Sequence, residues 1–590
     1  MKVYHRLYIA GFLLMGFALS SCKHYLDLQP ISSFGPETVF GTVENARMAV
    51  LGVYQELAGD QGYGIRISMY FPYDDDTYMG ASGDGDGDRR DIARYNLTPG
   101  NLQIEQPFEQ LYAGIERANQ CIKYIPQMDL YRNGTPQQQA ELRRLYGEAL
   151  TLRAQFYFQL MLNWGDVPAH WVPSADVQNL FEAKTSRDSI YDHILNDLQL
   201  AETLVPWRSE ISSLGDPNDE RITKGAVKGL RARIALFAGG YSLRQDGSMQ
   251  RRSDYLKYYQ IADTECLAII NSGQHSLDPS FQDLWQNQVD AHRIDPYGEI
   301  MFQVAMSGGT GATDSKLGYY NGPRLGGKGN SSVYPLPTYF YSFDSLDSRR
   351  DVTIAPYWVN ADYTIQAQSI STLCDGKFRR DWITNPSFGP TNNAQYFGIN
   401  WPILRYADVL LMFAEAENEI NNGPTPAAIN AFLQVRKRAF AGNPSRVGTP
   451  PADKQGFFNA IVNERAWEFG GEGIRKYDLI RWNLLGTMLN NTKAALQAMA
   501  NGQPPYNNLP SKMYYKLNST TLIWGNSFYQ PAPATTPSGY GSVNWVSSSM
   551  LTSNSLNKYA EGFTAGKTEL FPFPQAIISA NPNLVQNPGY

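Results

Sequence analysis

Apolar residues recur at helical spacing along most of the chain. Between residues 44 and 58, for example, Val50, Val53 and Leu57 fall three or four positions apart, which places them on one face of a helix. The same pattern predicts further helices over residues 107–125, 137–163, 187–204, 222–239, 253–271, 404–421, 425–440, 453–470 and 474–489. The sequence therefore predicts a mostly α-helical fold.

The predicted helices follow one another in pairs with short connections, as in helical-repeat scaffolds. The helix over 137–163 ends just before Gly165 and Pro168, a combination that stops helices. No period of about 34 residues is visible, so any tetratricopeptide-like repeats are degenerate.

Three stretches lack the helical pattern and are rich in Gly, Ser, Tyr, Asp or Asn, namely 72–101, 305–335 and 501–565. Loops of such length in a folded chain are usually functional or disordered. No Pro/Ser-rich linker separates two domains, and we expect one intertwined globular unit.

The first 21 residues have the pattern of a signal peptide. A basic start precedes an apolar run over 7–19, which is shorter than the roughly 20 residues of a membrane-spanning helix. Leu19 stands three positions before Cys22 with serines between, which resembles the lipobox of bacterial lipoproteins. We expect lipidation at Cys22, with acyl chains that hold the protein to a membrane by about 0.8 kcal/mol per buried methylene. An ordinary signal peptide that happens to precede a cysteine is the alternative.

The composition is that of a folded globular protein, with 43% hydrophobic and 18% charged residues. The net charge of -6 and the absence of a basic stripe exclude a nucleic-acid partner. Aromatic residues reach 13%, an excess compatible with platforms that stack on sugar rings or peptide side chains. The three cysteines after Cys22 form no metal motif and no disulfide framework, and we expect buried thiols at Cys121, Cys266 and Cys374.

Two motifs approach nucleotide or metal sites and are interpreted as plain loops. Residues 322–328 nearly match a phosphate-binding loop, but Gly329 stands where Ser or Thr must bind the metal. Residues 84–88 alternate Asp and Gly, but Arg89 replaces the glycine that a calcium loop requires. We expect a solvated acidic turn there, with loose calcium binding as the alternative. The six histidines have no metal spacing, and we predict neither a metal site nor a cofactor.

The segment 464–482 is dense in paired charges and could suggest a glycosidase, which needs two carboxylates flanking a sugar bond. Its acids alternate with arginines at helical spacing, beside Trp467, Phe469 and Trp482. Buried structural ion pairs at a helix junction explain this pattern better. We therefore predict no catalytic residue and no enzymatic activity.

Several segments resemble the SusD/RagB family of Bacteroidetes outer-membrane lipoproteins. The matching segments are Tyr25-Leu26-Asp27-Leu28-Gln29-Pro30, residues 112–119, residues 153–168 with Trp164-Gly165-Asp166-Val167-Pro168, residues 223–233, residues 405–416 and residues 573–590. The resemblance covers residues 22–590, as an N-terminal SusD-like region over 22–300 and a C-terminal SusD/RagB region over 301–590.

The resemblance implies tetratricopeptide-like helix pairs as a scaffold and a loop-rich ligand-binding lobe. It implies a lipid-anchored protein of the outer membrane, facing the cell exterior, with a SusC-like TonB-dependent transporter as partner. In that picture the protein captures oligosaccharide and delivers it to the transporter. Oligopeptide capture of the RagB type is the alternative, and a surface glycoside hydrolase is the remote one. One departure is that Lys23 and His24, with only Asp27 nearby, stand where family members often have acidic residues.

The resemblance also places candidate ligand contacts in the loops of the ligand face. These are Tyr73, Asp75, Tyr78, Trp285, Tyr319, Tyr320 and Trp358. Rings at such positions would stack on a glycan, each contributing about 0.5–1.5 kcal/mol beyond area burial. The motifs that carry the resemblance belong to the scaffold and do not name the ligand.

Overall fold

The computed structural model describes residues 35–80, 87–212 and 215–590. The signal peptide, Cys22 and the segment Tyr25–Pro30 lie outside this part of the chain, as do Asp84 and Asp86 of the acidic run. Among the described residues, no helix combines the length and the apolar character needed to cross a bilayer.

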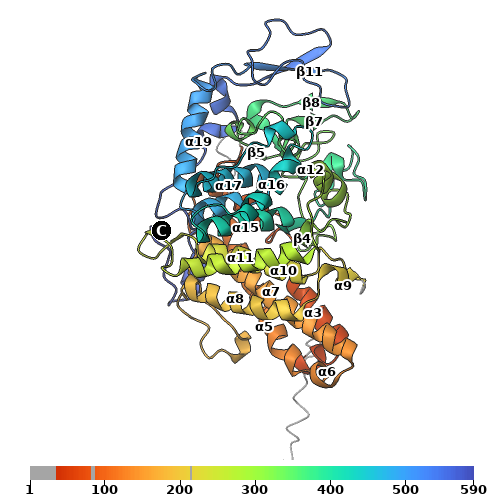
Figure 1. Cartoon of the computed structure of the whole chain (residues 1–590), viewed down its shortest axis with the longest axis vertical. Coiled ribbons are helices and arrows are strands. Elements are labelled where there is room, and N and C mark those ends of the chain that lie inside the picture. The colour runs from red at the N-terminus through yellow and green to blue at the C-terminus, as the bar shows by residue number, and fades with distance from the viewer. Residues whose placement is uncertain (1–34, 81–86, 213–214) are drawn as a thin grey trace, which may run out of the picture.

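Paired helices stack on one another through the lower and middle parts of the molecule (Figure 1). In chain order they are α3 (Val43–Gln55), α5 (Leu102–Tyr124), α7 (Pro136–Trp164), α8 (Arg187–Leu204), α10 (Lys224–Ala238), α11 (Tyr255–Ser272), α15 (Tyr406–Ile420), α16 (Pro426–Ala439) and α17 (Lys454–Phe469). The prediction of a mostly α-helical fold is confirmed. The three cysteines are buried free thiols, as predicted.

Helix α7 lies at the centre of the stack and shows how the sequence sets its ends. Thr135 caps its start: its hydroxyl accepts from the Gln138 amide, and the Gln138 side chain accepts from the Thr135 amide at 2.9 Å. Gly165 ends it with a φ of +73°, a conformation that favours glycine. Between these ends α7 contacts α3, α5 and α8, which explains why its second half is buried on all sides.

The predicted helix over 474–489 is wrong in one respect, because it is two helices. Helix α18 (Arg475–Arg481) ends before Asn483, whose φ is +57°, and α19 (Leu485–Ala500) begins two residues later. The amide of Leu484 donates to the carbonyl of Leu479 at 2.7 Å and closes the turn. Asn is one of the few residues other than Gly that enters the left-handed region easily.

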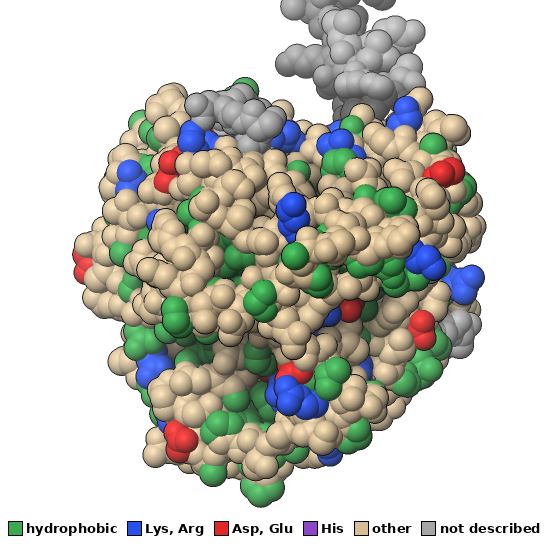
Figure 2. All heavy atoms as spheres, turned by 90° about the horizontal axis from the view of Figure 1, so that it is seen from above, with side chains coloured by type: hydrophobic (Ala, Val, Ile, Leu, Met, Phe, Trp, Pro, Cys, Tyr) green, Lys and Arg blue, Asp and Glu red, His purple; other side chains and the backbone are tan. Residues whose placement is uncertain are grey.

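Short antiparallel strand pairs and long loops form the opposite end of the molecule, where Figure 1 labels β5, β7, β8 and β11, whereas β4 lies at mid-height beside the helices. The pairs used below are β1 (Thr77–Met79) with β5 (Val333–Pro335), β4 (Ile300–Val304) with β10 (Trp401–Arg405), β7 (Tyr357–Val359) with β8 (Ile365–Ala367), and β11 (Lys512–Lys516) with β12 (Tyr540–Asn544). Viewed onto this end, Figure 2 shows a mainly uncharged surface with scattered single charges.

The regions before and after residue 300 pack against each other without a break, because β4 pairs with β10 and α11 packs on α15.

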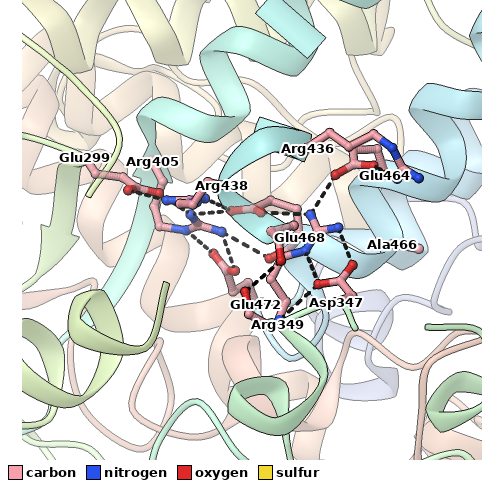
Figure 3. A network of polar contacts seen from close by, with 12 residues as sticks. Glu299, Asp347, Arg349, Arg405, Arg436, Arg438, Glu464, Ala466, Glu468 and Glu472 are labelled. Carbon is pink, nitrogen blue, oxygen red and sulfur yellow. Dashed lines mark hydrogen bonds and ion pairs between the residues drawn. The ribbon is translucent and has the colours of Figure 1, made fainter. Parts of the chain in front are cut away.

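A network of buried charges joins the helix stack to the loop-rich end (Figure 3). Arg405, at the end of β10, donates to Glu472 and Glu299 at 2.7 Å and to Glu468 at 2.9 Å. Arg438 and Arg349 approach Glu468 from α16 and from the 344–350 loop. The prediction of structural ion pairs in the segment 464–482 is confirmed.

Glu468 supplies an acid-sensitive part of this network. Burial alone would raise its pKa, but Arg438, Arg405 and Arg349 outweigh burial and lower the pKa from 4.5 to about 2. A lowered folded-state pKa stabilises the fold above the unfolded value of 4.5, and this contribution is lost as the pH falls toward 2. We expect Glu468→Gln to cost roughly 3 kcal/mol at neutral pH, at 1.36 kcal/mol per pKa unit.

The cost of Glu468→Gln should shrink as the pH falls below 4.5, since protonation also removes the charge from the parent side chain. Urea unfolding of both proteins at a series of pH values down to about 3 measures this difference. A difference between the two proteins that stays constant over this range would contradict the assigned role of Glu468.

Candidate ligand-binding site

Two of the predicted ligand contacts, Tyr319 and Tyr320, lie side by side between β4 and β5. Their rings meet edge to face with centres 5.2 Å apart, and both side chains are half-buried. Tyr320 also packs edge to face on the buried Tyr70 at 6.1 Å. The pair therefore offers partly exposed rings on a fixed base.

A third half-buried ring, Tyr396, extends this surface. Lys316 lies between the rings, with its ammonium 6.0 Å from the centre of Tyr320 and 4.8 Å from that of Tyr396. The Tyr396 hydroxyl donates to the Asp60 carboxylate at 3.1 Å, and Lys316 pairs with the same carboxylate at 3.5 Å. We call Tyr319, Tyr320 and Tyr396, with Lys316 and Asp60 between them, the tyrosine face.

Two loops far apart in the sequence meet closely to position these charges. The amide of Asp60 donates to the carbonyl of Gly311 at 2.7 Å, and the amide of Lys316 donates to that of Gly64 at 3.1 Å. Gly59 has a φ of +78°, and a Cβ there would lie 2.5 Å from the carbonyl oxygen of Ala312. Glycine is thus required where the two backbones touch.

Burial and neighbouring groups keep the Tyr396 hydroxyl neutral and Lys316 charged at neutral pH. Burial raises the pKa of Tyr396. Burial alone would lower the pKa of Lys316, but contacts with Tyr396 and Asp60 outweigh it and raise that pKa. The tyrosine face can therefore stack on a flat ligand and donate hydrogen bonds to it.

A cavity of about 460 Å³ adjoins the tyrosine face, and Tyr396 belongs to both. Phe388 and Phe397, which meet edge to face at 4.8 Å, form part of its wall. Asp219 and Gln303 lie in the same wall, with Gln303 coming from β4. The volume is within the range of about 300–1,000 Å³ that is typical of small-molecule sites.

Three of the predicted contacts are wrong because their rings fill the core. Tyr73, Tyr78 and Trp285 are 2%, 3% and 0% exposed. The Tyr78 hydroxyl donates to the carbonyl of Ser371 at 2.6 Å, and Trp285 packs on Phe378 at 5.4 Å. None of the three rings has a face available to a ligand.

The remaining two predicted contacts pair with other residues. Asp75 forms a two-pronged ion pair with Arg475, with distances of 2.8 and 3.0 Å. Trp358, in β7, is half-buried, and the guanidinium of Arg324 lies 4.5 Å from the centre of its ring. In the part of the chain that the structure describes, no contact joins either side chain to Tyr319, Tyr320 or Tyr396.

Sequence reasoning missed Tyr396, although a signal was present. The surrounding residues 384–400 are rich in Asn, Pro and Gly and carry no helical pattern, so they form a fourth long loop. The described residues contain no group of three or more His, Cys, Asp or Glu side chains placed to hold a metal ion.

The chain thus combines a stack of helix pairs with long loops that carry a ring-lined cavity. A family model described as "SusD family" matches residues 298–590, and one described as "Starch-binding associating with outer membrane" matches residues 25–236. The chain belongs to the SusD/RagB family.

Relatives and solved structures agree with this assignment. A SusD-like protein of Formosa agariphila is 25% identical over 509 residues, which cover 80% of this chain and 88% of the relative. The crystal structure of a SusD homologue from Bacteroides thetaiotaomicron superposes with a TM-score of 0.73 at 23% identity, over 93% of this chain and 97% of that one. A surface glycan-binding protein from the same organism, in complex with laminarihexaose, gives a TM-score of 0.62 at 17% identity, over 92% and 99% of the two chains. The fold is therefore SusD-like.

Proposed function

We propose that this protein captures oligosaccharide at the tyrosine face and the adjoining cavity, without cleaving it. The observation that carries the proposal is a group of three half-buried tyrosines, one of which, Tyr396, also lines a cavity of about 460 Å³. Sugar rings present flat C–H faces that stack on aromatic rings, and their hydroxyls bond to charged and amide groups between the rings. Lys316 and Asp60 supply such groups here.

The comparisons support a glycan over other ligands. One matching family model is described as starch-binding, and a structural neighbour is described as a laminarin-binding SusD-like protein. We propose further that the captured chain passes to a SusC-like TonB-dependent transporter of the outer membrane. Ring contacts contribute only about 0.5–1.5 kcal/mol each beyond area burial, so the affinity should be modest and release easy. Oligopeptide capture is the alternative.

Titration calorimetry with laminari-, malto- and cellohexaose, alongside a mixed tryptic peptide digest, tests the choice of ligand. We expect at least one hexaose to bind with a dissociation constant between the micromolar and millimolar ranges, and the peptides not to bind. Chromatography of the same mixtures after long incubation should show intact hexaose. Binding of peptides alone would favour the alternative, and shortened products would show an enzyme.

We propose that Cys22 carries the lipid anchor and that the protein faces the cell exterior. In its native host, a Cys22→Ala variant is expected to leave the membrane fraction, because the acyl chains are the proposed attachment. Fractionation and immunoblotting measure this, with Cys121→Ala as the control, since Cys121 is buried in α5. A Cys22→Ala variant that stays with the envelope would refute lipid anchoring.

A further inference from the structure

The wall of the cavity holds hydrogen-bond acceptors that have no partner. Asp219 is only 2% exposed, and neither of its carboxylate oxygens has a hydrogen-bond partner among the described residues. The side-chain oxygen of Gln303, which is 5% exposed, has no partner within the same set of residues. Both side chains line the cavity of about 460 Å³.

Of the neighbouring polar side chains, Asn400 already has hydrogen-bond partners, whereas His292 offers a further free acceptor. The Asn400 amide group donates to Glu220 at 2.8 Å and accepts from the amide of Met306 at 2.8 Å. His292 contacts the carbonyl oxygen of Asn385 through Nδ1, and an Nδ1–H that donates there leaves Nε2 as an acceptor. In the described structure Nε2 also has no partner.

Asp314, in the same cavity wall, shows how this fold satisfies a buried carboxylate when no ligand is needed. Its oxygens accept from the amides of Ser315 at 2.6 Å and of Gly309 and Gly398 at 2.9 Å. Asp219 has no comparable set of close amide donors: burial, followed by the nearby Glu220, raises its pKa to about 6, and the backbone at Asp295 and at Asp219 itself opposes this rise only in part. Buried acceptors without partners are rare and costly in native proteins, so an external donor is the natural complement.

We propose that the cavity binds an uncharged sugar residue of the captured chain, with adjacent hydroxyls donating to Asp219 and a further hydroxyl donating to Gln303. The proposal rests on the proposed function and narrows its substrate class. Phe388 and Tyr396 would meet the C–H face of the same ring. Uronic acids and sulfated sugars would be disfavoured, because three carboxylates, Asp219, Glu220 and Asp314, line the cavity against the single guanidinium of Arg293, which is exposed.

The spread of the acceptors favours hydroxyl groups over an ammonium group. An ammonium donates all its hydrogen bonds from one nitrogen atom, whereas the free acceptors belong to three residues, Asp219, Gln303 and His292. A sugar ring carries several donors spaced around its edge. A peptide amino terminus would satisfy only part of the set.

The test uses the full chain and the hexaose that binds it best among laminari-, malto- and cellohexaose. Asp219→Asn keeps the size of the side chain but removes the charge and one acceptor, and we expect at least tenfold weaker binding. The same variant should melt at a higher temperature than the parent, because it removes an unpaired buried charge. Asp129→Asn, at an exposed position on helix α6 (Asp129–Asn133), is the matched control and should change neither quantity.

A second comparison tests the charge rule, since hexagalacturonate should bind more weakly than the neutral hexaose. Unchanged affinity in Asp219→Asn, or binding of hexagalacturonate as tight as that of the neutral hexaose, would overturn the inference. If Asp219→Asn binds normally while Tyr320→Ala does not, the cavity assignment fails and glycan capture at the tyrosine face stands. If no hexaose binds the parent protein, the proposed function itself fails.

Discussion

Replacing Arg405 with alanine is expected to lower the free energy of unfolding by about 3–5 kcal/mol, because it leaves buried carboxylates without their main counter-charge. Arg405 is 1% exposed and donates to Glu299, Glu468 and Glu472 at 2.7–2.9 Å. These residues connect β10 with α17 and with the turn that follows it. Urea unfolding followed by tryptophan fluorescence measures the loss.

The matched control is Arg446→Ala. Arg446 pairs with Asp344 at the surface, where its side chain is 50% exposed, and exposed ion pairs contribute under about 1 kcal/mol. A loss for Arg405→Ala no larger than that of Arg446→Ala would show that the buried network does not hold the two parts of the molecule together.

The double variant Tyr320→Ala/Tyr396→Ala should bind the preferred hexaose about 30-fold more weakly, equivalent to roughly 2 kcal/mol. Both rings flank Lys316, and Tyr396 also lies at the cavity. The variant therefore removes stacking surface on both sides of the proposed ligand path. Titration calorimetry measures the change, and the melting temperature reports whether the fold is intact.

Two further variants separate ring stacking from general loss of aromatic surface. Tyr396→Phe keeps the ring and loses only the hydroxyl with its contacts to Asp60 and Lys316, so it should weaken binding less than the double variant does. Tyr363→Ala removes a tyrosine that is 53% exposed at the turn between β7 and β8, and binding should be unaffected. Equal losses in Tyr363→Ala and the double variant would count against a specific site.

Local signals in the sequence predicted most of the helices. The helix over 137–163 was bounded by recognisable stop residues, and α7 spans Pro136–Trp164 in the structure. The break at Asn483 was missed, although Asn is, after Gly, a residue that ends helices in the left-handed conformation. The buried pairing of 464–482 followed from acids and arginines at helical spacing, but their partners Glu299 and Arg349 lie far away in the sequence.

Only part of the candidate site could be predicted, because an aromatic residue in a loop can either fill the core or remain exposed to a ligand. Tyr319 and Tyr320 are half-exposed and form the tyrosine face, whereas Tyr73, Tyr78 and Trp285 fill the core. Nothing local distinguishes these cases, since burial depends on which distant loop covers the ring. The cavity wall likewise combines residues from the 219–220, 288–314 and 386–400 segments, a meeting that only the folded chain brings about.

The most direct test of glycan capture at the tyrosine face is a crystal structure of the protein with the tightest-binding hexaose. We predict sugar rings stacked on Tyr320 and Tyr396, with one residue of the chain entering the cavity beside Phe388. A hexaose bound elsewhere on the molecule, with these tyrosines uncovered, would contradict the account.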